Sequence, residues 1–290
     1  MDKKYASFAS VRFDLQNPEP INYASSNGEM WEFMKNHLPD PSLAYTDPNE
    51  TSDVITMITQ FLNNTQVPIC GSQIVILMKR HLRGAFPNID FINRMIESNN
   101  IHIIVLSSMS PVGGYETSLY GLTSFSKGIC AYADDGKFEK ASFHKICQST
   151  AYPYLVYSKD VEVLAIGNMT LPNMNLPYTN EYQLLMTVQD HGNSAFLSYC
   201  KTDVSCYLGT RDEFKKLRLE WTNMDSSATG FVETNSTDPT EMGGTLFWSD
   251  GNIKMTSGSY DMKLSYSYSY TNPQILQIRF YSVKPINYFV

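Results

Sequence analysis

Hydrophobic positions in the first half of the chain alternate between two patterns. Apolar runs, such as Ile74–Met78 and Ile103–Leu106 within "IHIIVL" at 101–106, are typical of strands buried on both faces. Between them, apolar residues recur every three or four positions in segments that begin near 30, 54, 91 and 119, which is typical of amphipathic helices. This alternation predicts a mainly parallel sheet covered by helices on both faces.

From about Val156 onward the period changes to two. The segments "VEVLAI", "YQLLMTV", "LRLEW", "TLFWS", "DMKLSYSYSY" and "ILQIRFY" are separated by turn-forming clusters such as "NMDSSATG" and "SDGN". On "DMKLSYSYSY" we expect Met262 and Leu264, with the tyrosines, to face the core, and Asp261 and Lys263 to face water. The predicted fold class is α/β plus all-β, with an α/β domain at 1–152 and an antiparallel β-sandwich at 156–290.

Charge and hydropathy narrow the choice of partners. The 290 residues carry 22 Lys and Arg against 29 Asp and Glu, a net charge of -7 with no basic block, which argues against nucleic acid. The longest aliphatic run, Ile74–Met78, is far shorter than the roughly 20 residues of a membrane-spanning helix. No apolar segment typical of a signal peptide occurs in the first 30 residues, so we predict neither a membrane span nor a signal peptide in the chain as given.

The five cysteines form no CxxC pair and stand at no zinc-site spacing from a histidine, so we expect no metal or other cofactor. Cys200 and Cys206 flank "KTDVS", and a disulfide across the base of that hairpin is predicted. Cys70, Cys130 and Cys147 are expected at the amino end of the parallel sheet, and which of them pair stays open.

Four Asn-x-Ser/Thr sequons make Asn49, Asn63, Asn168 and Asn235 candidate glycosylation sites. In a chain this rich in Asn, Ser and Thr, chance alone gives roughly four such matches. The sequons therefore add little to the case for a secreted glycoprotein.

The order of several segments resembles a known family. "VRFD", a capped helix after "NETSD", "QIVILMK", "IHIIVLSS" and "SLYGLTSFSKGICAYADD" follow one another as in a von Willebrand factor A domain. With its Tyr-rich β domain, the chain resembles nematode extracellular proteins that pair an A-like domain with a β-sandwich. The resemblance implies an extracellular, non-enzymatic recognition or adhesion protein, in a host-defence or epithelial setting, that binds its ligand at the rim of the parallel sheet.

The chain departs from the family at its metal-ion-dependent adhesion site. Thr51 matches the family's Thr, but Lys79 and Arg80 stand at the family's Asp position, where a cation repels a divalent metal. The family's Asp-x-Ser-x-Ser loop and first strand have no counterpart, so we predict a degenerate metal site and an N-terminally incomplete chain. Asp225–Thr229 fits Asp-x-Ser-x-Thr but runs into "GFVE" rather than a helix, and we interpret it as a polar β-turn.

A cationic rim without a metal suits a protein or glycan ligand, possibly an acidic one. The candidate ligand-binding residues at this rim are Thr51, Lys79, Arg80, Ser107, Ser110 and Tyr115. Two alternatives stay open. The chain could be a hydrolase that uses the Ser107–Ser110 loop with His81 as its base, or a structural extracellular protein with an inert rim.

Overall fold

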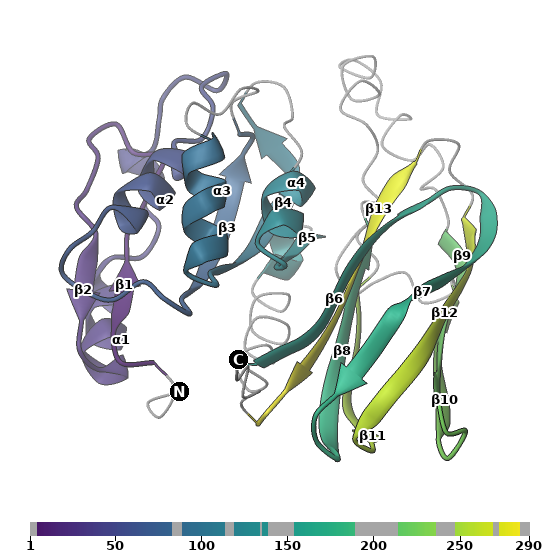
Figure 1. Cartoon of the computed structure of the whole chain (residues 1–290). Helices are drawn as coiled ribbons and strands as arrows, with labels where there is room; N and C mark the ends of the chain where they lie inside the picture. Colours follow the sequence, from purple (N-terminus) through teal and green to yellow (C-terminus); the bar gives the residue numbers. More distant parts are fainter. Residues whose placement is uncertain are drawn as a thin grey trace, which may run out of the picture. The chain divides into compact units, whose positions relative to one another are not determined.

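A computed structural model describes residues 5–82, 89–113, 119–133, 135–138, 154–188, 214–235, 247–268 and 273–284 (Figure 1). The contacts between residues divide the chain into two compact units, Met1–Gly128 and Ile129–Val290. Each unit is described by itself below. Among the described residues, no helix combines the length and the apolar composition needed to cross a bilayer.

The first unit alternates strands and helices as the hydrophobic pattern predicts. Its elements are β1 (Phe8–Ser10), β2 (Asn22–Ala24), α1 (Asn27–Asn36), the 3-10 turn η1 (Pro41–Leu43), α2 (Val54–Leu62), β3 (Gln73–Arg80), α3 (Ile89–Ser98), β4 (His102–Val112) and α4 (Leu119–Phe125). β1 and β2 form an antiparallel hairpin, and β3 and β4 pair in parallel. β5 (Ile129–Ala133) belongs by its contacts to the second unit.

Three details of this unit differ from the sequence prediction. The run Ile74–Met78, predicted to be buried on both faces, has one exposed face in β3, where Val75 and Leu77 are 41% and 47% exposed. The segment "SSMSPV", which contains the predicted Ser107–Ser110 loop, lies within β4. After a register shift beyond Met78 and Ser107, the backbone pairs with β3 again at Arg80 and Val112. The short hydroxyl side chains of Ser107 and Ser108 allow this, because they fit into the closed interior of the sheet. The apolar stripe of α1 also stays mostly exposed, since Met30 is its one buried residue.

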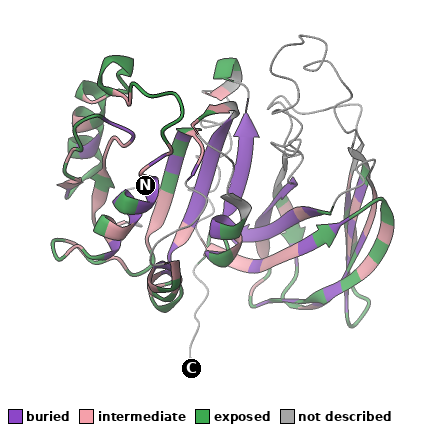
Figure 2. Cartoon of the chain, turned by 90° about the horizontal axis from the view of Figure 1, so that it is seen from above, coloured by how far each residue is buried: buried purple, intermediate pink, exposed green. Residues whose placement is uncertain are grey.

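The second unit is a sandwich of two antiparallel sheets. Its strands are β6 (Tyr154–Val163), β7 (Ile166–Leu176), β8 (Asn180–Val188), β9 (Phe214–Asn223), β10 (Thr229–Asn235), β11 (Phe247–Met255), β12 (Gly258–Tyr268) and β13 (Gln274–Ser282). They form the sheets β10-β9-β12-β7 and β11-β8-β13-β6. Apolar side chains from the inner faces of both sheets make one core. Figure 2 colours the buried positions of the strands purple. An α/β part followed by an antiparallel β-sandwich confirms the predicted fold class.

The alternation along β12 is also as predicted, with Met262 and Leu264 fully buried and Asp261 and Lys263 exposed. The segment "VEVLAI", in contrast, is no single strand. The chain reverses between Val163 and Ile166, where Ala165 takes a left-handed φ of 52°. Pattern alone missed this tight turn, because no Gly, Asn or Asp marks it.

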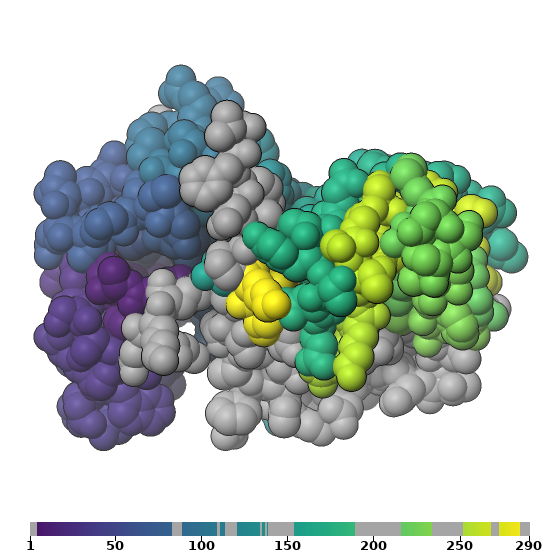
Figure 3. All heavy atoms as spheres, turned by 60° about the horizontal axis from the view of Figure 1, so that its bottom comes forward, coloured from purple at the N-terminus to yellow at the C-terminus, as the bar shows by residue number. Residues whose placement is uncertain are grey.

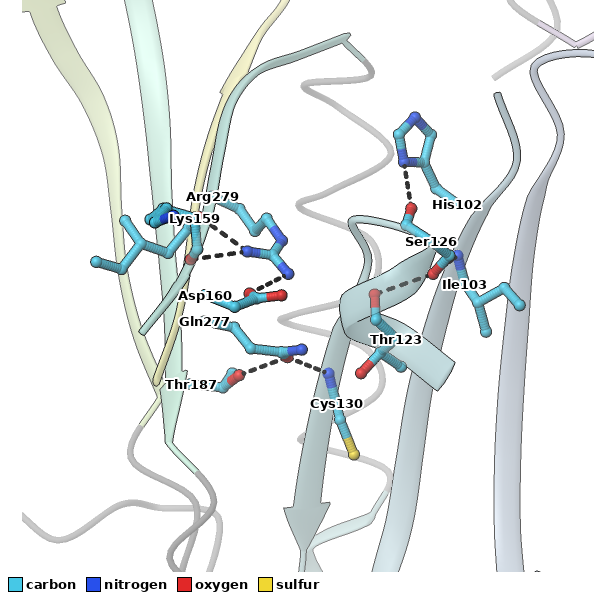
Figure 4. A network of polar contacts seen from close by, with 11 residues as sticks. His102, Ile103, Thr123, Ser126, Cys130, Lys159, Asp160, Thr187, Gln277 and Arg279 are labelled. Atoms are coloured by element: carbon cyan, nitrogen blue, oxygen red, sulfur yellow. Dashed lines mark hydrogen bonds and ion pairs between the residues drawn. The ribbon is translucent and has the colours of Figure 1, made fainter. Parts of the chain in front are cut away.

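The face of sheet β11-β8-β13-β6 that points away from the core carries several polar contacts within the unit (Figure 4). Arg279 of β13 is fully buried, forms an ion pair with Asp160 at 2.6 Å, and donates to the carbonyl oxygen of Lys159. The Gln277 side-chain oxygen accepts hydrogen bonds from the Thr187 hydroxyl and from the backbone N–H of Cys130 in β5. β5 therefore contacts this face at Gln277, whereas sheet β10-β9-β12-β7 carries exposed polar residues such as Asp261 and Lys263.

Candidate functional site

The predicted rim lies where β3 ends, and Arg80 dominates it. One terminal nitrogen of its guanidinium donates to the carbonyl oxygens of Asp47 and Glu50 at 3.1 and 3.0 Å, and the other donates to that of Tyr45 at 2.9 Å. The guanidinium carbon also lies 5.5 Å from the centre of the Tyr45 ring. Arg80 is therefore committed to the protein's own 45–50 loop, and carbonyl oxygens that could ligate a metal are bound to a guanidinium.

A second group of contacts in this unit involves the buried carboxylate of Asp14. Asp14, which has a left-handed φ of 61°, accepts hydrogen bonds from the Ser52 hydroxyl at 2.7 Å and from the Asp53 N–H at 3.0 Å. The N–H of Asp14 in turn donates to the Asp53 carboxylate at 2.8 Å. Burial raises the pKa of the Asp14 carboxyl from 3.8 to about 6, although the Ser52 hydrogen bond opposes the rise. These hydrogen bonds join the start of α2 to the segment that follows β1.

The other predicted rim residues are not brought together as one accessible surface. Lys79 is exposed and Thr51 is half-buried, whereas Ser107 is only 2% exposed. The side chain of Ser110 and the whole of Tyr115 lie outside the described residues. Within the described part of the chain, no three His, Cys, Asp or Glu side chains gather as a metal site. A hydrolase based on Ser107 would need a hydroxyl that a substrate can reach, which this burial prevents.

A more open polar surface lies on sheet β10-β9-β12-β7. Because side chains on one face of a strand recur every second residue, the strand register places Phe231, Glu220 and Lys263 in one row across β10, β9 and β12. The same register places Thr222 beside Asp261. We call this surface the outer face. The green and yellow-green atoms of β9, β10 and β12 lie side by side on it in Figure 3.

Arg218 organises the outer face. Its guanidinium lies over the Phe231 ring, 3.9 Å from the ring centre, and donates to the carboxylates of Glu220 and Glu233. Lys216 adds an ion pair to Glu233 at 3.1 Å, and these two cations lower the pKa of the Glu233 carboxyl. Each charge of this network has its partner on a neighbouring strand or on the same strand, so the network fixes the position of Phe231.

Beside this network the outer face is hollowed into a depression of about 720 Å³. The lining residues are Arg218, Glu220, Trp221, Thr222, Thr229, Gly230, Phe231, Asp261 and Lys263. Phe231 is 57% exposed. Gly230 lies opposite Trp221, and a Cβ at Gly230 would point to the core side and lie 2.5 Å from the indole nitrogen of Trp221. The volume falls in the range of about 300 to 1,000 Å³ that is usual for small-molecule sites.

The predictions about the cysteines and the glycosylation sites concern other parts of the chain. Cys200 and Cys206 lie outside the described residues, and so does Cys147, while Cys70 is an exposed free thiol. Asn49, Asn63 and Asn168 are exposed, and Asn168 lies on β7 of the sheet that carries the outer face. The Asn235 side chain lies outside the described residues.

The sequence analysis did not single out Phe231 or Arg218. The available signal was the alternation in "LRLEW" and "GFVE", which turns Arg218, Glu220 and Phe231 to the side opposite the core residues Leu219 and Val232. Asp225–Thr229 is the turn between β9 and β10, with the Ser227 N–H bound to the Asp225 carboxylate, in agreement with its interpretation as a polar turn.

The comparison with protein families gives one match. Residues 159–283, within the sandwich unit, match a domain of unknown function (DUF7154). No curated protein matches the chain. The similarity to nematode extracellular proteins therefore stays a prediction.

Similar solved structures include a carbohydrate binding module from Cellvibrio mixtus lichenase 5A in complex with cellotriose. It is 8% identical over 46% of this chain and 93% of that chain, with a TM-score of 0.24. The C-terminal module of a marine laminarinase from Zobellia galactanivorans is 13% identical over 45% of this chain and 95% of that chain, with a TM-score of 0.24. A von Willebrand factor type A protein from Catenulispora acidiphila is 10% identical over 75% of this chain and 39% of that chain, with a TM-score of 0.27. Likenesses this distant carry no argument about a ligand.

Proposed function

We propose that this chain is a non-enzymatic extracellular recognition protein and that it binds its ligand on the outer face of the sandwich rather than at the rim of the α/β unit. One observation carries the proposal. The outer face holds a depression in which an exposed aromatic ring lies among polar side chains that the fold does not use. The hydroxyls of Thr222 and Thr229, the Asp261 carboxylate and the Lys263 ammonium make no side-chain hydrogen bond or ion pair with the described residues.

Polar groups left without a partner on a rigid sheet are available to a ligand at little conformational cost. The rim differs, because Arg80 is bound to three backbone carbonyls and Ser107 is buried. The absence of catalysis is part of the proposal. It is supported by the burial of Ser107 and Ser108, the serines that the hydrolase alternative would use.

The test is a binding screen of the full chain on a glycan microarray, with Phe231→Ala beside the wild type. Trp31→Ala is the matched control, because Trp31 of α1 is an aromatic residue of the other unit with a similar exposed fraction, 59%. We expect Phe231→Ala to lose the glycans that the wild type retains and Trp31→Ala to keep them. If Phe231→Ala keeps its ligands, the outer face is not the binding site.

Catalysis is examined on the same ligands. Each retained oligosaccharide is incubated with the wild-type chain, and its length is followed by mass spectrometry. An unchanged length is expected, and shortening that requires the intact protein would contradict the proposed non-enzymatic role.

A further inference from the structure

We infer that the ligand of the outer face is a neutral oligosaccharide. This inference rests on the proposed function and names the class of molecule that the depression selects. It differs from the acidic ligand that a cationic rim would favour.

Charge balance is the first argument. The depression is lined by two cations, Arg218 and Lys263, and by two carboxylates, Glu220 and Asp261. Arg218 is already paired with carboxylates, and an anion that approached Lys263 would also meet Asp261, two residues away on the same face of β12. An acidic ligand therefore gains little attraction here, and a cationic one gains no more.

The kinds of polar group give the second argument. Thr222 and Thr229 offer hydroxyls that both donate and accept, Asp261 offers acceptor oxygens, and Lys263 offers donors. A sugar hydroxyl also donates and accepts at once, so it can use neighbouring groups of both types. A ligand rich in hydroxyls and without charge satisfies this mixture without leaving a buried ion unpaired.

The aromatic ring gives the third argument. Phe231 is held by the Arg218 guanidinium and remains 57% exposed, so it offers a fixed apolar surface against which the C–H side of a sugar ring can pack. A protein ligand would need more, because stable protein interfaces are built around a cluster of buried apolar and aromatic anchors. Within the lining, Phe231 is the single exposed large apolar side chain.

The experiment compares uncharged with charged oligosaccharides of equal length by isothermal titration calorimetry on the full chain. The neutral probes are hexasaccharides of β-1,3-glucan, β-1,4-glucan, chitin and mannan. The acidic probes are hexasaccharides of heparin and hyaluronan. We expect at least one neutral probe to bind and both acidic probes to bind more weakly than it does.

Variants then locate the bound probe. Phe231→Ala is expected to weaken the neutral probe about tenfold or more, and Asp261→Asn about threefold to tenfold, because a stacking surface and an acceptor are lost. Ile166→Ala is the matched control, since Ile166 is a highly exposed apolar residue of β7 outside the lining. Raising the salt from about 0.05 M to about 0.5 M is expected to change the affinity less than twofold.

The possible failures are distinct. If acidic probes bind best, and Phe231→Ala removes them, the outer face is the binding site but its ligand is not neutral. If a neutral probe binds and Phe231→Ala has no effect, the proposed function itself is wrong. If no hexasaccharide binds, the ligand is not an oligosaccharide of this kind and the inference is overturned.

Discussion

Arg80 and Arg218 are both strand residues that lie over an aromatic ring, yet their surroundings differ. The N–H groups of Arg80 end on three backbone carbonyls of the 45–50 loop. Those of Arg218 end on the side chains of Glu220 and Glu233, and its ring partner Phe231 stays exposed. Backbone acceptors fix a loop in place, whereas side-chain acceptors hold a surface in order and leave its neighbours available. A cation at the end of a strand is therefore no sufficient sign of a binding site.

The largest loss of stability is expected from a substitution at Gly113, which lies next to the 45–50 loop that Arg80 binds. Its N–H donates to the Pro48 carbonyl, its φ is +82°, and a Cβ would lie 2.3 Å from the Glu50 carbonyl oxygen. Gly113→Ala should lower the free energy of unfolding by about 3 kcal/mol, because the backbone atom it meets cannot move aside.

Gly71→Ala is the matched control, since Gly71 has a φ of +72° but no atom within 4 Å of a Cβ. It should show the backbone strain alone, about 1 kcal/mol. Urea unfolding followed by circular dichroism measures both variants. Equal losses would mean that the 45–50 loop is not tightly held against Gly113.

The second effect compares the two arginines directly. Arg80→Ala should cost about 2 kcal/mol of unfolding free energy, because three carbonyls lose a charged donor. Arg218→Ala should lower the free energy of unfolding much less than Arg80→Ala, as expected for exposed ion pairs, but should weaken ligand binding. If Arg218→Ala proves the more destabilising substitution, the outer face is a structural feature like the rim.

The third effect depends on pH and concerns Asp14. Its folded-state pKa of about 6 lies above the ordinary value of 3.8, so folding favours the protonated form. The stabilising contribution of this group is fully present below about pH 4 and is lost as the pH rises through 6. Since one pKa unit corresponds to about 1.4 kcal/mol, the loss at pH 7 should reach about 3 kcal/mol at most.

Asp14→Asn removes the ionisation and keeps an oxygen that can accept from Ser52 and Asp53. The variant should therefore lose the part of the pH dependence between 4 and 7 that Asp14 causes, while stability at pH 4 stays close to that of the wild type. Melting temperatures across this range measure the difference. A slope identical to that of the wild type would show that Asp14 does not titrate there.

Periodicity predicted the positions of many elements. The apolar run Ile74–Met78 forms β3, and the alternation in "DMKL" assigned Asp261 and Lys263 to the outside of the sandwich. The run wrongly predicted burial on both faces of β3, because Val75 and Leu77 are exposed. The same rule was too weak for α1, where a helical apolar pattern predicts a covered face and Trp31 is nevertheless exposed. The pattern shows which residues could be buried together, but other elements decide whether they are.

The candidate site was harder to predict, because it depends on contacts between strands. Lys79 and Arg80 stood out in the sequence as adjacent cations, but the position of the 45–50 loop, which turns Arg80 inward, is not visible in one strand. Phe231 and Arg218 are 13 positions apart in the sequence and become neighbours only through the β9–β10 register. A register shifted by one residue would place these side chains on opposite faces.

The smallest effect is expected from a substitution in the ion-pair network that holds Phe231 on the outer face. Glu233 accepts from Lys216 and Arg218, and both cations hold its pKa below the ordinary value, so the pair stays ionised at neutral pH. Glu233→Gln should leave the free energy of unfolding nearly unchanged, because water screens the charges of these groups. Arg218 keeps Glu220 as a partner but loses one of its two anchors.

The position of Phe231 then becomes less fixed, and we expect ligand affinity to fall about twofold to threefold. Lys254→Gln is a matched control, since Lys254 is exposed on the other sheet and lies 3.9 Å from Glu181. Calorimetric titration and urea unfolding of the two variants separate affinity from stability. A loss of affinity without a loss of stability would show that the Arg218 network serves binding. The reverse result would give the outer face the same structural role as the loop around Arg80.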